Sequence, residues 1–129
     1  MTVDLKKKFR FRNFPVYKDA RKFNQEIRIL SKQKFPKEEQ YCLTSQIWRA
    51  SYSIILNIAE GCDRGTDKDF AHYLNNSHTS LNEVVACLDV ALDNNYININ
   101  EHSYYLNKAA NLSDQLTAFR KSLLNNPIK

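Results

Sequence analysis

The sequence predicts an all-α protein, arranged as an antiparallel up-down-up-down four-helix bundle. Its 129 residues include only two glycines and three prolines, and apolar residues recur at spacings of three and four in four separate segments. That period places apolar side chains on one face of a helix, which must pack against other helices. Because only a few residues join the segments, consecutive helices are expected to run antiparallel. A chain of this length forms one domain, with a basic N-terminal arm (residues 1–14) and the bundle (residues 15–126).

The first two helices are delimited by prolines, hydroxyl side chains and a glycine. Pro15 suits a first helical position, and Pro36 stops the helix that Pro15 begins. After the turn KEEQY, the hydroxyl of Thr44 or Ser45 is expected to accept the free N–H groups of a second helix. Gly61 is expected to end that helix as the residue beyond its last turn. The expected helices are residues 15–34 and 44–61.

Two further helices begin with paired polar side chains. Thr66 and Asp69 have the spacing of a capping box, and so do Asn98 and Glu101. In such a pair, the side chains satisfy backbone N–H groups that the first helical turn leaves free. A single amphipathic pattern follows each pair. The expected helices are residues 66–93 and 98–126.

The second helix carries apolar residues on more of its surface than one bundle core can cover. The row expected in the core is Ile47, Ala50, Ile54 and Ile58. The second row is Trp48, Tyr52, Ile55 and Ala59. Large aromatic residues are common where subunits meet. The predicted oligomer interface therefore consists of Trp48, Tyr52 and Ile55.

A narrow polar stripe separates these two rows. Asn57, Glu60 and Arg64 recur at spacings of three and four, so their side chains lie on one side of the helix. A structural network that fixes the following turn is favoured over a catalytic cluster. The predicted structural polar network is Arg49, Asn57, Glu60 and Arg64.

Positive charge is concentrated near the N-terminus. Residues 1–37 contain twelve basic and three acidic residues, whereas residues 38–129 contain seven basic and eleven acidic residues. Such asymmetry indicates a polyanionic ligand or an acidic partner surface, although the same cations could merely solvate a surface helix. Phe9, Phe11 and Tyr17 lie among them, either as base-stacking platforms or as a cover over the bundle end. The predicted nucleic-acid contacts are Lys6, Lys7, Lys8, Arg10, Arg12, Lys18, Arg21 and Lys22.

The cysteines indicate a reducing environment. Cys42, Cys62 and Cys87 are odd in number, lack a CxxC spacing, and lie in or beside apolar helical patterns. Buried thiols are therefore favoured over disulfides. No apolar run reaches the length of a signal peptide or a membrane span. We expect a cytoplasmic protein that does not contact a membrane.

The sequence contains no set of residues that indicates an enzyme. A di-iron site in a bundle needs two Glu-x-x-His motifs, and this chain offers only Asp69-x-x-His72. His72 and His78 point to different helix faces because they are six residues apart. A glycine-rich phosphate loop is also missing. We expect a non-enzymatic protein without a cofactor or a metal.

Three segments resemble one bacterial protein family. FRFRNFPVYKDARKF, KFPKEEQYCLTSQIWRASYSIILNIAEGCDRG and DFAHYLNNSHTSLNEVVACLDVALDNNYI are similar, in order and spacing, to the four-helix bundle proteins encoded within intervening sequences of 23S rRNA genes. These are also called S23 ribosomal proteins, and the resemblance covers about residues 11–97. Cys42 stands where the family commonly has glycine, Trp48 where it has a basic residue, and Ile55-Leu56 where it often has Pro-Ser.

The resemblance implies a homopentameric ring without established enzymatic activity and with an association with RNA or an RNA-handling partner. Accessory proteins of diversity-generating retroelements look similar, and they partner a reverse transcriptase. Two functions therefore stay open. One is a nucleic-acid-binding assembly, and the other is a protein-protein adaptor or accessory subunit.

Overall fold

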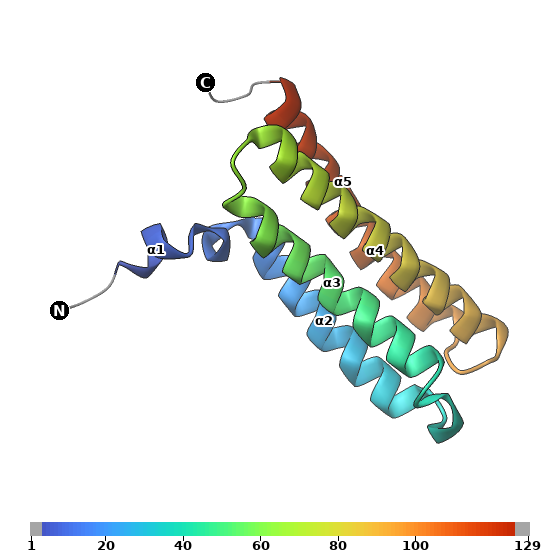
Figure 1. The fold of residues 1–129 in the computed structure, drawn as a ribbon. Helices are drawn as coiled ribbons and strands as arrows, with labels where there is room; N and C mark the ends of the chain where they lie inside the picture. Colours follow the sequence, from blue (N-terminus) through green and yellow to red (C-terminus); the bar gives the residue numbers. More distant parts are fainter. Residues whose placement is uncertain (1–3, 126–129) are drawn as a thin grey trace.

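The computed structural model describes residues 4–125, apart from the side chain of Lys6, and those residues form helices and no strands. A short helix, α1, and a 3-10 turn, η1, make up the N-terminal arm, and a second 3-10 turn, η2, joins the first two long helices (Figure 1). The all-α prediction with four long helices is confirmed. The elements are α1 (Leu5–Lys8), η1 (Arg10–Asn13), α2 (Pro15–Lys34), η2 (Lys37–Glu39), α3 (Leu43–Cys62), α4 (Asp67–Asp93) and α5 (Ile99–Asn125).

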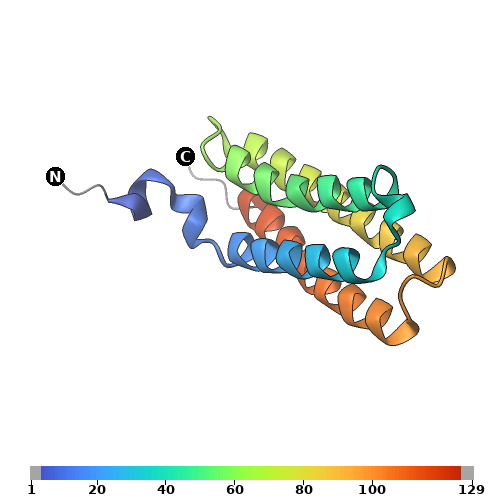
Figure 2. The same cartoon turned by 90° about the horizontal axis from the view of Figure 1, so that it is seen from below.

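The four long helices lie side by side, and the arm projects from one end of them (Figures 1 and 2). Contacts join α2 to α3, α3 to α4, α4 to α5, and α5 back to α2. At one end, the Phe14 ring before α2 lies 5.2 Å from the Phe119 ring near the end of α5. At the other end, Lys34 Nζ lies 3.5 Å from Glu101 Oε2 in the first turn of α5. The first and last helices therefore close the bundle against each other.

One row of each helix fills the core between them. In α3 the row expected in the core is buried, and Ile47 and Ile58 are fully covered. The second row is not: Trp48 and Ile55 are half-buried, and Tyr52 is 40% exposed. Burial of one large aliphatic side chain is worth roughly 1.5–3 kcal/mol. The largest fully buried apolar side chains are Ile27, Ile47, Ile54, Ile58, Leu74, Leu81, Val84, Leu88 and Leu116.

The start of α3 differs from the prediction. The helix begins at Leu43, and the side chain of its N-cap residue, Cys42, accepts no capping hydrogen bond. Instead, the Leu43 N–H donates to Glu39 Oε1 at 3.2 Å. The expected cap at Thr44 or Ser45 is wrong because η2 brings a carboxylate to the first free N–H group one residue earlier.

The expected role of Gly61 is also wrong. Gly61 lies inside the last turn of α3, which ends at Cys62, and its φ is not positive. A Cβ atom on Gly61 would stand 2.5 Å from Tyr73 Cβ and 3.0 Å from Phe70 Cδ1. The glycine is required because α4 approaches the α3 backbone too closely for a side chain.

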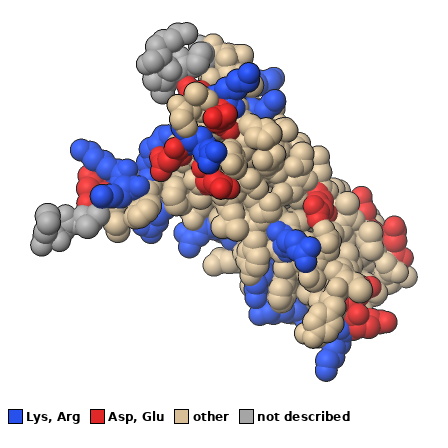
Figure 3. All heavy atoms as spheres, in the orientation of Figure 1, with Lys and Arg blue, Asp and Glu red and all other residues tan. Residues whose placement is uncertain are grey.

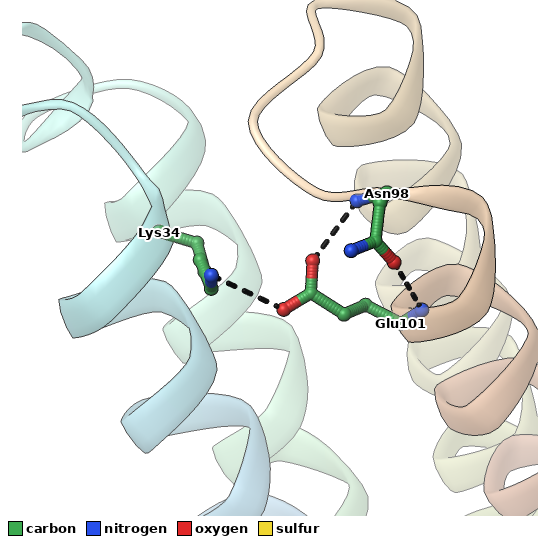
Figure 4. Close-up of polar contacts among 3 residues, drawn as sticks. All are labelled: Lys34, Asn98 and Glu101. Carbon is green, nitrogen blue, oxygen red and sulfur yellow. Dashed lines mark hydrogen bonds and ion pairs between the residues drawn. The ribbon is translucent and has the colours of Figure 1, made fainter.

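The starts of α4 and α5 are as predicted. Thr66 Oγ1 accepts a hydrogen bond from the Asp69 N–H at 3.1 Å. Before α5, the Asn98 N–H donates to Glu101 Oε1 at 2.9 Å and the Glu101 N–H donates to Asn98 Oδ1 at 2.8 Å (Figure 4). The second Glu101 oxygen faces Lys34, so this cap also connects α5 to the end of α2.

Candidate nucleic-acid and assembly surfaces

The N-terminal arm is held against the bundle by Arg10. Its Nη2 donates to the backbone oxygen of Cys62 at 2.7 Å, and its Nε lies 3.9 Å from Asp63 Oδ1. Its guanidinium also lies 5.7 Å from the centre of the Phe14 ring. Arg10, which the sequence suggested as a phosphate contact, therefore has protein partners at the C-terminal end of α3, where a cation is favourable.

Three other predicted cations meet where the arm joins α2. Arg12 from η1 and Lys18 and Arg21 from α2 line a hollow of about 280 Å³, together with Leu5 and Asn13. Among the described residues, no carboxylate lines this hollow. Ammonium and guanidinium groups bind phosphate oxygens strongly, so the hollow has the chemistry of a phosphate site.

The aromatic residues of the arm have different environments. Phe11 is half-buried, packs against the core, and meets the Tyr17 ring edge-on at 5.0 Å. Arg21 lies over the other ring of this pair, 5.7 Å from the centre of Tyr17. Phe9 is exposed. Phe11 and Tyr17 therefore cover the bundle end and position Arg21, whereas Phe9 keeps a ring in solvent.

The remaining predicted cations extend this basic region. Lys7 and Lys8 on α1 and Lys22 on α2 are exposed, and the side chain of Lys6 lies outside the described part of the chain. Figure 3 shows Lys and Arg atoms gathered on the arm and along the lower left edge of the molecule, where α2 lies in Figure 1. The basic side of the molecule is thus built from the arm and α2.

Trp48 is covered by cations of its own chain. Its Nε1 donates to Ser31 Oγ at 2.7 Å. Arg28 lies 4.2 Å and Lys32 lies 5.9 Å from the ring centre, and Arg28 also donates to the Tyr52 hydroxyl. Such a stack of a cation on an indole ring is the strongest kind of cation–π contact. Trp48 therefore orders two α2 cations rather than presenting a bare apolar face.

The exposed apolar surface lies one to two turns further along α3. Tyr52, Ile55 and Leu56 line a hollow of about 310 Å³ between α3 and α2, with Arg21, Asn24 and Gln25 on its other side. Leu56 is 64% exposed. Leu56 was not predicted as an interface residue because it belongs to neither apolar row, but its position four residues after Tyr52 places both on one face. Tyr52, Ile55 and Leu56 are hereafter the α3 apolar patch.

The predicted polar stripe does not form one network. Asn57 donates to the backbone oxygen and the hydroxyl of Ser53, at 2.8 and 3.0 Å. Arg64 lies over the Tyr73 ring, 5.1 Å from its centre. Within residues 4–125, no hydrogen bond or ion pair joins Arg49, Asn57, Glu60 and Arg64 to one another. Side chains of one exposed helix face gain little from mutual contacts in water, so Asn57 and Arg64 use nearer partners.

The cysteines divide into two buried thiols and one exposed thiol. Cys62 and Cys87 are buried as predicted, and burial raises the pKa of both, that of Cys87 to about 11. The prediction for Cys42 is wrong, because it precedes α3 on the exposed turn. Within the described residues, no three His, Cys, Asp or Glu side chains are placed to hold a metal ion. None of the described helices is long and apolar enough to cross a membrane.

Comparison with known proteins identifies the family. Residues 12–118 match the sequence profile of the 23S rRNA-intervening sequence protein family. The chain belongs to this family. No curated protein matches the sequence. A crystal structure at 1.70 Å resolution is similar, and it shows a protein of unknown function from the S23 ribosomal protein family of Bacteroides thetaiotaomicron VPI-5482. It has a TM-score of 0.75 and 24% sequence identity, with 82% of this chain and 98% of that chain covered.

The family match includes only part of the basic region. It begins at Arg12 and contains all three cations of the hollow and the whole α3 apolar patch. Lys7, Lys8 and Arg10 precede it. The predicted family is confirmed, whereas a relation to proteins of diversity-generating retroelements stays a prediction.

Proposed function

We propose that this protein is a non-enzymatic, cytoplasmic helical-bundle protein that binds nucleic acid through its N-terminal arm and α2. The hollow of Arg12, Lys18 and Arg21 carries the proposal, because three cations from two elements converge there and no carboxylate in the described part of the chain lines it. The order of contacts around the bundle supports an antiparallel up-down-up-down scaffold that presents α2 along one edge. The membership of the chain in a family named after an rRNA element adds support.

The expected mode of binding is electrostatic. Phosphates that replace counterions around these cations make the affinity strongly dependent on salt and weakly dependent on sequence. The Arg28 and Lys32 side chains over Trp48 extend the cations along the same helix. A nucleic-acid backbone that lies along α2 would therefore contact both the hollow and these two side chains.

The test compares salt dependence in matched variants. Fluorescence anisotropy would follow structured RNA, duplex DNA and single strands over a salt series. Replacing Arg12, Lys18 and Arg21 with Gln should reduce the log-log salt slope by about 2.7 on duplex DNA and about 2 on single strands. Replacing Lys68, Arg120 and Lys121 with Gln removes the same charge elsewhere and serves as the control. If wild-type protein retains no nucleic acid at about 50 mM salt, the nucleic-acid proposal fails and the adaptor proposal takes its place.

We also propose that five copies form a ring through the α3 apolar patch. The exposure of the patch supports this proposal, because Tyr52 is 40% and Leu56 is 64% exposed. Covering such a patch with another copy of the chain removes apolar surface from water, which favours association. The number of copies follows from the resemblance to pentameric proteins. Five chains of 15.1 kDa would give a particle of about 75 kDa.

Analytical ultracentrifugation tests the ring. Leu56→Glu places a charge in the patch and should give monomers that remain helical, and Trp48→Glu, at the predicted interface residue one turn before Tyr52, should do the same. Ile99→Glu is the control, because Ile99 is equally exposed but lies at the start of α5. A wild-type monomer of 15.1 kDa at micromolar concentration would reject the ring.

The second proposed function is an adaptor for a protein partner such as a reverse transcriptase. The exposed side chains favour it, since Tyr52, Leu56 and Ile29 suit the core of a protein interface. A reverse-transcriptase gene beside the coding sequence would support the adaptor, whereas a reading frame inside an rRNA intervening sequence would support the nucleic-acid function.

A further inference from the structure

A groove lies between α2 and α5, the pair of neighbouring long helices that contact each other least. It encloses about 470 Å³, within the range of sites for small ligands. The walls of the groove are Asp19, Lys22 and Glu26 from α2 and Tyr104, Asn107, Lys108 and Asn111 from α5, and its floor is Phe23 and Leu112.

Hydrogen bonds between the two helices hold the ends of the groove. The Tyr104 hydroxyl donates to Glu26 Oε1 at 2.9 Å, and Gln115 Nε2 donates to Asp19 Oδ2 at 2.9 Å. Each carboxylate keeps lone pairs for a further donor. The two helices are thus bridged on either side of the groove.

The chemistry of the groove is divided between an apolar floor, an aromatic wall and charged edges. Phe23 and Leu112 are buried, and the ring of Tyr104 is nearly half exposed. Lys22 and Lys108 stand on opposite walls, and Lys108 Nζ lies 5.3 Å from the centre of the Tyr104 ring. A ligand that uses all three parts has a flat, partly apolar body, polar edges and an anionic group.

We propose that this groove binds one unpaired nucleotide of a single-stranded nucleic acid. The base lies on the floor beside Tyr104, the phosphate lies between Lys22 and Lys108, and the amides of Asn107 and Asn111 bond the base edge. Carboxylates accept hydrogen bonds from exocyclic amino groups, so Asp19 and Glu26 favour adenine, cytosine and guanine over uracil. An apolar helix would leave these charged walls unpaired, and an inorganic anion would leave the floor unused.

This inference rests on the proposed binding of nucleic acid and specifies that the strand is unpaired in the groove. It also assigns Lys22 to a different site from the other α2 cations, because Lys22 lines the groove, whereas Lys18 and Arg21 line the hollow by the arm. A strand held at both places would pass along α2.

Calorimetric titration of the full chain tests the site with adenosine monophosphate, uridine monophosphate and inorganic phosphate. Adenosine monophosphate should bind several-fold more tightly than uridine monophosphate, and both more tightly than phosphate. Lys108→Gln should weaken binding about tenfold, the loss expected for one charged hydrogen bond. Asn111→Trp, which fills the groove from an exposed position, should abolish it. Lys121→Gln on the same helix is the control and should leave the affinity unchanged.

Competition separates a strand from a free nucleotide. A single-stranded oligonucleotide should displace adenosine monophosphate, whereas duplex DNA should not. The inference is overturned if adenosine monophosphate gives no heat, if phosphate binds equally well, if Lys108→Gln matches Lys121→Gln, or if the single strand does not compete. In each case, salt-dependent binding at Arg12, Lys18 and Arg21 would still support the proposed function. If the protein binds the nucleotide but retains no nucleic acid, both the proposed function and the inference that the groove binds a nucleic-acid strand are rejected.

Discussion

Replacing Gly61 with alanine tests whether close contact between α3 and α4 explains this glycine. The new Cβ would lie 2.5 Å from Tyr73 Cβ and 3.2 Å from Tyr73 Cγ. Carbon atoms in contact normally lie about 3.5–4.0 Å apart. Tyr73 Cβ cannot rotate away, because it is bonded to the helix backbone, so the two helices must separate by about 1 Å.

The magnitude follows from two unfavourable effects and one favourable effect. Overpacking of this kind costs roughly 1–3 kcal/mol, whereas alanine inside a helix gains about 1 kcal/mol over glycine. A gap of up to about 1 Å also loses a quarter to a half of each nearby dispersion contact. We expect a net loss of about 1–2 kcal/mol of unfolding free energy, which lowers Tm by roughly 4–8 °C.

Thermal and urea unfolding followed by circular dichroism would measure this loss. Gly65→Ala is the matched control, because a Cβ there meets nothing within 4 Å and the residue has no positive φ. The control should be neutral or stabilising by about 0.4–1 kcal/mol, through a less flexible unfolded chain. A Gly61→Ala protein that unfolds at or above the wild-type Tm would refute the packing argument.

Two more predictions concern titratable groups. In the native protein, an alkylating reagent should modify Cys42 but leave Cys62 and Cys87 intact until unfolding, because both are buried and their thiol pKa values are raised; peptide mass spectrometry reads the sites. The Tyr96 hydroxyl donates to Glu39 Oε2 at 2.8 Å, which raises the Tyr96 pKa to about 12. This bond therefore stabilises the fold fully below about pH 10 and is lost as pH approaches about 12. Ultraviolet titration should show the pKa falling in Glu39→Gln, and an unchanged value would contradict the assignment.

Local features of the sequence predicted most of the fold. Pro15, Pro36 and the Thr66–Asp69 pair act within one helical turn, so their effects could be foreseen from neighbouring residues. Gly61 could not be interpreted correctly in this way, because its neighbour Tyr73 belongs to the next helix. Local rules assign a glycine near a helix end to the cap, while the actual cause is the distance between two helices.

The candidate sites were less predictable than the fold for the same reason. The basic arm was evident from composition, but the partner of Arg10 is the Cys62 carbonyl, 52 residues away. The groove brings together Lys22 and Lys108 from the first and last long helices. The last long helix, α5, has an ordinary amphipathic pattern, so nothing in its sequence indicated that Lys108 is a binding residue.

Trp48 shows how one aromatic side chain changes the surface around it. The sequence predicted that this residue lies in an oligomer interface. In the structure, Arg28 and Lys32 of α2 lie over that ring, at 4.2 and 5.9 Å from its centre. Cation–π attraction to the indole ring therefore holds two cations of α2 near this position. Positive charge therefore lies beside Trp48, and Tyr52 and Leu56 are the more exposed apolar side chains of α3.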